Sequence, residues 1–327
     1  MSAPPVAPPV TVVVVTWQGR HLLAACLDSL RRQTVDHQVL VVDNASTDGT
    51  AELLAGAYPE ARVLQTGSNT GFAGGVAHAL DVVDTPYLAL LNNDATAAPR
   101  WLETLLEHAE DHPEAAAVTS RMVLTDAPDT LNNTGVLLLA DGHGADRDLG
   151  APASARPLPG EVFGFSGGAA LLRTPTVRAV GGMPARFFLY YEDTDLSWRL
   201  RLAGWHVRYE PAALVHHQHS ATVDQQSGSF AFHNERNRLL TLVRCAPAGT
   251  AVRAVLRYLL TTASLTVRRL RGGTVPDVAT FRLGVRLRAL RSFLRLLPWA
   301  LRSRRAIVGT ATVRPAAVAS RWAGRDE

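Results

Sequence analysis

Short apolar runs alternate with helix-like segments over the first 120 residues. The apolar, β-branched run at 10–16 is typical of a strand buried on both faces, and further strands are predicted at 39–42, 62–65, 87–91 and 115–120. Between them, apolar residues recur at helical spacing, which predicts helices at about 21–32, 50–57, 76–83 and 99–111. Alternating strands and helices form βαβ units, so we expect an α/β fold with a mostly parallel sheet flanked by helices.

The second half of the chain follows a different pattern. Residues 126–160 are predicted to be irregular, and a strand at 163–172 is interrupted by Gly167-Gly168. A helix ending at Gly204 and a strand at 206–209 follow, and beyond about residue 230 the pattern is wholly helical. We expect a disordered proline-rich tail over 1–9, a domain over 10–245 with halves at about 10–120 and 121–245, and a basic amphipathic helical region over 246–327.

Polar residues gather where the predicted strands end. Thr16, Asp43 to Asp48 and Asn92-Asn93-Asp94 each follow a buried run directly. Parallel sheets of this class bind ligands outside the carboxyl ends of their strands, so these residues should converge on one site.

The loop Asn69-Thr70-Gly71-Phe72-Ala73-Gly74-Gly75 precedes a predicted helix. Its glycines would let the backbone approach a phosphate at the helix N-terminus, although a purely structural turn is an equal alternative. It matches neither a Walker A loop nor a dinucleotide-binding fingerprint.

Two segments carry candidate metal ligands. Asp94 beside two asparagines offers hard oxygen ligands suited to Mg²⁺ or Mn²⁺, with an ordinary turn as the alternative. In His216-His217-Gln218-His219, alternation places His217 and His219 on one side of an extended segment. A shared divalent metal or simple hydrogen bonding would explain them better than zinc, because no cysteine lies nearby at a standard spacing.

The segment FFLYYEDTDLSWR places Glu192, Asp193 and Asp195 at a helix N-terminus after five apolar or aromatic residues. Clustered like charges cost free energy unless a cation or a proton-transfer role offsets the repulsion. The structural alternative is a helix cap made by Asp193 or Thr194, with the other acids complementing the helix dipole.

Together these segments resemble glycosyltransferase family 2, specifically its bacterial rhamnosyltransferase-like and galactofuranosyltransferase-like members. The matching stretches cover about residues 10–240 in the expected order and read VVDNASTDGT, NTGFAGG, LNND, FSGGAALLR, FFLYYEDTDLSWRLRLAGW and HHQHSAT to HNERNR. The resemblance implies a GT-A fold, a nucleotide-sugar donor, a divalent metal and inversion at the anomeric carbon.

The resemblance also implies roles for residues. Asp193 looks like the catalytic base, Asp94 like the metal-binding end of a DXD-like motif, and His217 like an additional metal ligand. The implied donor-binding residues are Thr16, Asp43, Asn44, Asn69, Gly71, Gly74 and Asn93, and the implied acceptor or supporting residues are Gly167, Gly168, Glu192 and Asp195. Direct inverting transfer needs one base for the acceptor hydroxyl and positive charge on the departing diphosphate, which agrees with two separate carboxylate sites.

Charge is distributed unevenly along the chain. Residues 251–327 contain 16 arginines and three acids, a net charge of +13, so the rest of a chain of net charge +4 carries −9. Basic amphipathic helices bind anionic membranes, although a helical cap on the catalytic domain would also explain the pattern. We do not expect nucleic-acid binding, because no reader motif is present.

These observations predict a metal-dependent inverting glycosyltransferase at the inner face of the plasma membrane. Its donor would be a nucleotide sugar, with rhamnose as one candidate, and its acceptor a polyprenyl-linked or cell-envelope glycan. The two cysteines suit buried thiols in a reducing cytoplasm, and the N-terminal MSAPPVAPPV does not resemble a signal peptide. A non-catalytic nucleotide-sugar-binding protein and a nucleotidyltransferase are the alternatives.

Overall fold

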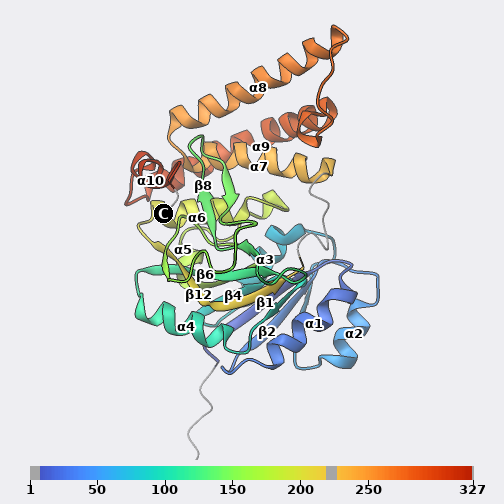
Figure 1. Ribbon diagram of the computed structural model, residues 1–327, viewed down its shortest axis with the longest axis vertical. Helices are drawn as coiled ribbons and strands as arrows, with labels where there is room; N and C mark the ends of the chain where they lie inside the picture. The colour runs from blue at the N-terminus through green and yellow to red at the C-terminus, as the bar shows by residue number, and fades with distance from the viewer. Residues whose placement is uncertain (1–7, 219–226, 326–327) are drawn as a thin grey trace, which may run out of the picture.

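The computed structural model describes residues 8–218 and 227–325. Its N-terminal half is a Rossmann-like unit in which neighbouring strands run parallel (Figure 1). The strands are β1 (Val10–Thr16), β2 (Gln38–Asp43), β3 (Arg62–Gln65) and β4 (Tyr87–Leu91). The helices are α1 (Arg20–Arg31), α2 (Thr50–Ala57), α3 (Gly71–Val82) and α4 (Trp101–Asp111).

The second half extends the same sheet to the order β10-β12-β6-β11-β4-β1-β2-β3. The added strands are β6 (Ala115–Leu124), β10 (Gly160–Glu161), β11 (Ala169–Arg173) and β12 (His206–His217). β11 is antiparallel to both of its neighbours, whereas β12 is parallel to β6. Short strands β5 (Ala95–Ala97) and β7 (Leu131–Asn133) pair with β12 and β6, and β8 (Val136–Leu138) forms a separate hairpin with β9 (Gly144–Asp146).

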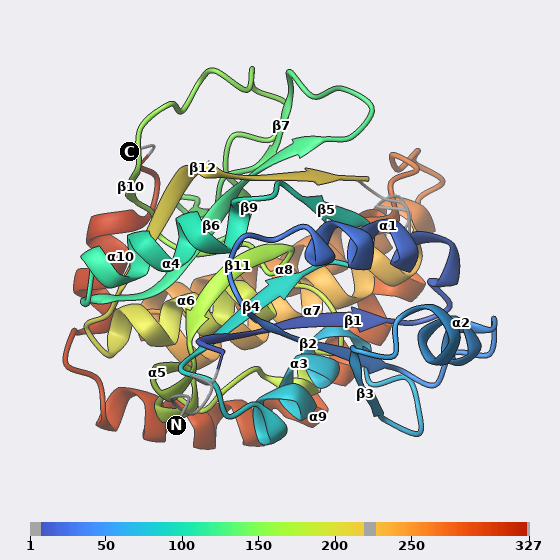
Figure 2. The same cartoon turned by 90° about the horizontal axis from the view of Figure 1, so that it is seen from below.

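The sheet is covered on both faces, which explains its continuous apolar strands. Val10, Val12 and Val14 of β1 face the core beneath α1 and α4, whereas Val13 faces the core beneath α3. The second core also includes residues of α5 (Thr174–Ala179) and α6 (Glu192–Leu202). Figure 2 shows α1 and α4 on one side of the strands and α3 and α5 on the other.

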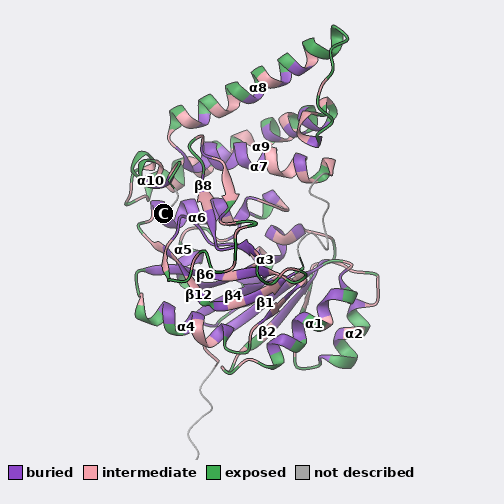
Figure 3. Ribbon diagram, viewed as in Figure 1, coloured by how far each residue is buried: buried purple, intermediate pink, exposed green. Residues whose placement is uncertain are grey.

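Helices α7 (Gly228–Cys245), α8 (Ala248–Leu270), α9 (Leu283–Gly309) and α10 (Pro315–Trp322) follow. Phe293 of α9 and Trp322 of α10 share a hydrophobic core with Phe187 and Trp198, so these two helices cap the α6 side of the molecule. α8 is the outermost helix, and exposed residues run along it (Figures 1 and 3). Within the described residues, no helix is long and apolar enough to cross a membrane.

The predicted bounds of β1, β3 and β4 match the structure, but four other predictions need correction. α3 begins at Gly71 rather than near 76, because its glycines pack inside the first helical turns. Only Ala169–Arg173 of the strand predicted at 163–172 pairs with neighbours as β11, and the strand predicted at 206–209 continues to His217. The stretch predicted to be irregular contains β7, β8 and β9. Of the predicted tail, residues 1–7 lie outside the described residues.

Candidate active site

The predicted site residues meet at the carboxyl ends of the parallel strands. Thr16 ends β1, Asp43 ends β2, and Asn92 to Asp94 follow β4. Asn93 Nδ2 donates to Thr16 Oγ1 at 3.0 Å, so the ends of β1 and β4 are tied together by buried side chains.

His217 and Asp94 are brought together by strand pairing. β5 pairs antiparallel with the end of β12, with Ala95 opposite His217, and this register places Asp94 beside the imidazole. His217 Nε2 lies 3.1 Å from Asp94 Oδ1. An imidazole nitrogen and a carboxylate oxygen at this separation suit two ligands of one Mn²⁺ or Mg²⁺ ion.

Asn132 of β7 orients that imidazole. Its Oδ1 lies 2.9 Å from His217 Nδ1, which therefore donates, and leaves the Nε2 lone pair directed toward Asp94 and Asn92. The contacts with Asn132 and Asn92 also fit the hydrogen-bonding alternative for His217. His219, the other candidate of the motif, lies outside the described residues.

Two protein groups are too few to fill the coordination shell of a divalent ion. The described residues contain no group of three His, Cys, Asp or Glu side chains that could hold a metal. Asp94 and His217 nevertheless fit the open type of site, in which one or two protein ligands are completed by substrate phosphate oxygens and water.

Asn44 is buried and hydrogen-bonded to the Gly-rich loop. Its Nδ2 donates to the Gly71 carbonyl at 3.1 Å, and its Oδ1 accepts from the Thr70 hydroxyl at 2.8 Å. Asp43 accepts from Ser46 N and from Gln65 Nε2, each at 3.0 Å. Both side chains are buried, so in this structure they stabilise the loop after β2 and the Gly-rich loop.

The glycines of the loop fit the structural alternative given above, because their neighbours leave no room for a side chain. Gly71 has a φ of +70°, and a Cβ there would overlap the carbonyl oxygen of Phe188. A Cβ on Gly74 would meet Thr70, and one on Gly75 would meet Val15. Close packing of α3 therefore accounts for these three glycines, while Asn69 Oδ1 accepts from Gly71 N at 2.9 Å at the helix start.

Asp193 is half-buried at the start of α6 and is held by backbone donors. Its Oδ2 accepts from Gly167 N at 3.1 Å, and its Oδ1 accepts from Thr194 N at 2.6 Å. Burial raises the pKa of Asp193 above that of an ordinary aspartate, and the hydrogen bonds from Gly167 and Thr194 partly oppose this shift. A carboxylate with a raised pKa is a stronger base, which suits proton removal from a hydroxyl.

The helix-cap alternative for the acidic segment is wrong. The N-cap residue of α6 is Tyr191, and no side chain makes the capping hydrogen bond. Neither Asp193 nor Thr194 therefore occupies the capping position.

The two neighbouring acids differ from Asp193. Glu192 is buried, and burial followed by the charge of Asp193 raises its pKa well above the usual range. Asp195 is fully enclosed, where Arg199 Nε lies 2.8 Å from Oδ1 and Arg244 Nη1 lies 2.6 Å from Oδ2. Asp195 therefore anchors α6 to α7 and is not available to an acceptor.

Gly167 and Gly168 connect the two carboxylate regions. Gly167 supplies the amide donor to Asp193, and Gly168 O accepts from Asn92 N at 2.9 Å. A Cβ on Gly168 would meet Met122 and approach Asn92, so a small residue is needed beside the Asn92 to Asp94 segment.

Asp146 is a site residue that the sequence analysis missed. It ends β9, and Asn133 Nδ2 donates to its Oδ1 at 2.6 Å. The side chain reaches solvent, yet desolvation by the surrounding walls, followed by the charge of Asp193, raises its pKa to about 6. Gly144, two residues earlier on the same strand face, packs against Thr194, which directs that face toward the start of α6.

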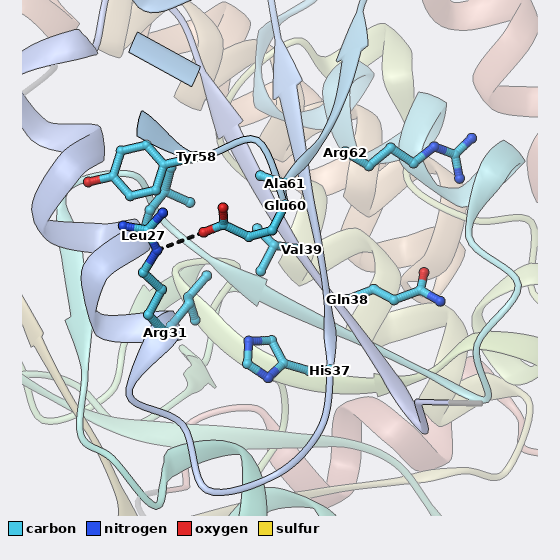
Figure 4. Close-up of a pocket in the computed structure, with 10 residues that line it drawn as sticks. Leu27, Arg31, His37, Gln38, Val39, Tyr58, Glu60, Ala61 and Arg62 are labelled. Carbon is cyan, nitrogen blue, oxygen red and sulfur yellow. Dashed lines mark hydrogen bonds and ion pairs between the residues drawn. The ribbon is translucent and has the colours of Figure 1, made fainter. Parts of the chain in front are cut away.

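A pocket lies elsewhere on the molecule. It has a volume of about 430 Å³ and is lined by residues of α1, β2 and the Tyr58 to Arg62 segment (Figure 4). Gln38 and Arg62 begin their strands, so this pocket opens at the ends of β2 and β3 opposite the polar clusters. Its Arg31–Glu60 ion pair, at 2.7 Å, is half-exposed and structural.

Comparisons with known proteins agree with this geometry. Residues 11–178 match the family model "Glycosyl transferase family 2". The chain is 30% identical over 250 residues to the N-acetylglucosaminyl-diphospho-decaprenol L-rhamnosyltransferase of Mycobacterium tuberculosis, covering 68% of this chain and 81% of that protein. It is 32% identical over 212 residues to galactofuranosyltransferase GlfT1 of Mycolicibacterium smegmatis, covering 60% and 66%.

A similar fold occurs in the crystal structure of GalNAc-T7 with UDP, GalNAc and Mn²⁺, at a TM-score of 0.62 and 12% identity over 90% of this chain and 57% of that one. The chain therefore belongs to glycosyl transferase family 2, has the GT-A fold and is a glycosyltransferase. The non-catalytic alternative loses its support.

Proposed function

We propose that this enzyme is a metal-dependent, inverting glycosyltransferase that transfers a sugar from a nucleotide-sugar donor to a polyprenyl-linked or cell-envelope glycan. The observation that carries the proposal is the separation of roles between two carboxylates. Asp193 is held by the Gly167 amide with a raised pKa, whereas Asp94 lies against His217. One free base and one metal-binding carboxylate are the requirements of a single displacement.

Each group has a defined task in that reaction. Asp94 and His217 would hold Mg²⁺ or Mn²⁺, which supplies positive charge to the donor diphosphate when bound. Asp193 removes the proton from the acceptor hydroxyl as that oxygen attacks the anomeric carbon. The carbon–oxygen bond to the diphosphate breaks, and the nucleoside diphosphate leaves with the bonding electron pair.

The donor side would be formed around Thr16, Asp43, Asn44, Asn69, Gly71, Gly74 and Asn93. Their buried hydrogen bonds stabilise the loops at the strand ends, so most would position the donor indirectly. Gly167, Gly168 and Glu192 would serve the acceptor side.

Localisation at the inner face of the plasma membrane would bring the enzyme to a lipid-linked acceptor. Both cysteines are free and buried, as in a protein of a reducing compartment. The outer face of α8 exposes apolar side chains beside arginines, which suits an anionic lipid surface.

A panel of nucleotide sugars tests the proposal, with dTDP-rhamnose first and a polyprenyl-diphospho-sugar as acceptor. We expect release of a nucleoside diphosphate with Mn²⁺, loss of that release with EDTA, and a product of inverted anomeric configuration by NMR. A donor should also raise the melting temperature. Release of pyrophosphate would instead identify a nucleotidyltransferase, and retention of configuration would overturn the single displacement.

A further inference from the structure

A strained turn contacts both the Gly-rich loop and α6, the helix that carries Asp193. In the turn, defined here as residues 187–191, three bulky aromatic residues have positive φ: Phe188 at 67°, Tyr190 at 68° and Tyr191 at 69°. L-residues with a Cβ disfavour this region of backbone conformation, so the surrounding structure must hold them there.

The turn contacts both sides of the proposed reaction. Its Phe188 carbonyl accepts from Ala73 N at 3.1 Å and lies where a Cβ on Gly71 would be, so it touches the first turn of α3. Its last residue, Tyr191, is the N-cap of α6, and the Tyr191 carbonyl accepts from Asp195 N at 2.8 Å. A shift of the turn would therefore move the Gly-rich loop and Asp193 together.

One side chain of α7 holds the turn. Asn237 is fully buried, and its Nδ2 lies 3.0, 2.8 and 2.7 Å from the carbonyl oxygens of Phe187, Leu189 and Tyr190. Arg236 Nε donates to Asn237 Oδ1 at 2.8 Å, which fixes the amide with its N–H groups toward the turn. Arg236 also donates to the Phe187 carbonyl at 2.6 Å.

We propose that Asn237 is a positioning residue for the transfer reaction, because its amide holds the strained turn that places the donor loop and the base relative to each other. This role rests on the proposed function. It also gives a role to the HNERNR stretch, which contains Arg236 and Asn237.

Two substitutions at Asn237 separate hydrogen bonding from packing. Asn237→Ala removes the amide, whereas Asn237→Asp keeps its shape but turns a carboxylate toward three carbonyl oxygens. We expect kcat to fall about 10- to 100-fold in both variants, because small displacements of reacting groups have effects of this size. Val243→Ala, which also lies on α7 and loses apolar contact, is the matched control and should keep kcat close to the wild-type value.

The readouts are kcat, KM for the donor and the melting temperature, measured well below unfolding. The positioning role is wrong if Asn237→Asp retains the wild-type kcat. It is also wrong if kcat in the two Asn237 variants falls no further than in Val243→Ala for the same loss of melting temperature. Should neither Asn237 variant fold, Gly71→Ala tests the same link from the donor loop: a fall in kcat at saturating donor supports it, and a change in KM alone contradicts it. An inactive wild-type chain would refute the proposed function instead.

Discussion

His217 Nε2 lies 3.1 Å from Asp94 Oδ1 although the two residues belong to opposite halves of the sheet. The antiparallel pairing of β5 with the end of β12 creates this contact, and Asn132 fixes the imidazole from the other side. The proposed metal site therefore depends on the second half of the chain being folded onto the first.

Removal of either proposed ligand should weaken metal-dependent binding. We expect Asp94→Ala to abolish Mn²⁺-dependent binding of the nucleoside diphosphate by calorimetry, and His217→Ala to show a milder defect. Asn132→Ala should lower metal affinity about 10- to 100-fold, as loss of a group that orients a ligand typically does. Binding of the free nucleoside should not change.

His216→Ala is the matched control for the histidine, because alternation along β12 turns its side chain to the opposite face. Unchanged Mn²⁺-dependent binding in Asp94→Ala would make Asp94 a turn residue only.

The proposed base is tested by Asp193→Asn, which keeps the shape of the side chain but cannot accept a proton at neutral pH. We expect kcat to fall about 100- to 10,000-fold, the usual contribution of a general base. Donor affinity and melting temperature should stay near wild type. Because burial raises the pKa of Asp193, wild-type transfer should decline on acidification at a pH above that typical of aspartate.

Asp195→Asn provides the contrast two residues away. It leaves Arg199 and Arg244 with an uncharged partner, so it should lower the free energy of unfolding by about 3–5 kcal/mol. Near-normal turnover in Asp193→Asn would refute its role as the base.

Much of the donor half could be predicted from the sequence, because local patterns determine it. β1 and β4 are short apolar runs followed by polar residues, and each ends where its own run ends. β3 was found at its predicted bounds as well, although it is mostly exposed. Asp94, Asp193 and His217 stood out because each is a polar residue at the end of an element.

Long-range contacts account for what the sequence could not show. Asn132, Asn133 and Asp146 lie in a stretch without clear periodicity, and they matter only because β7 pairs with β6 and β9 packs near α6. Asn44 and Gly71 were assigned to the donor side, but their contacts with α3 and the aromatic turn depend on tertiary packing. The positive φ values at Phe188, Tyr190 and Tyr191 also run against residue preference.

Asp146 gives a pH-dependent prediction. Its pKa of about 6 lies above that of an unfolded aspartate, so its ionised form is less favourable in the folded protein than in the unfolded chain. This costs stability above pH 6, where both states are ionised, and costs little near pH 4. Asp146→Asn should therefore raise the melting temperature at pH 7.5 and raise it less at pH 5. Asp146 and Asp193 repel each other when both are ionised. Asp146→Asn should therefore also move the acidic limb of kcat/KM to lower pH.

Asn133 is a suitable partner for a control, because Asn133→Ala removes the hydrogen bond to Asp146 and leaves the charge in place. In Asn133→Ala, Asp146 should therefore still titrate near pH 6 or above. An acidic limb that is identical in Asp146→Asn and the wild type would show that Asp146 does not influence the base.

The outer face of α8 leads to the last prediction, which concerns membrane binding. Val252, Leu256, Leu260, Val267 and Leu270 recur at helical spacing and are exposed, with Leu260 70% and Leu270 82% accessible. The buried residues of the helix, including Tyr258 and Leu265, lie on its other face. Exposed Arg253, Arg257, Arg268 and Arg269 flank the apolar stripe, and α8 contains no acid. A solvated helix gains nothing from such a stripe, whereas the interface of an anionic membrane accommodates both kinds of side chain.

Truncation would be a poor test of that surface, because α9 and α10 contribute Phe293 and Trp322 to the shared core. Substitutions in the full chain avoid this problem.

Each arginine near an anionic surface contributes about 1 kcal/mol, so Arg253→Gln with Arg268→Gln should weaken vesicle binding about 30-fold. The double variant Arg32→Gln and Arg100→Gln removes the same charge from exposed positions outside the basic helical region. It should bind like wild type. Co-sedimentation should be strong with anionic vesicles, weak with neutral ones and reduced by salt. Binding that persists at high salt would come from the apolar side chains, so Leu256→Ser with Leu260→Ser should remove it. Equal binding to both kinds of vesicle, or equal weakening in the control variant, would leave α8 as a structural helix with no electrostatic role at the membrane.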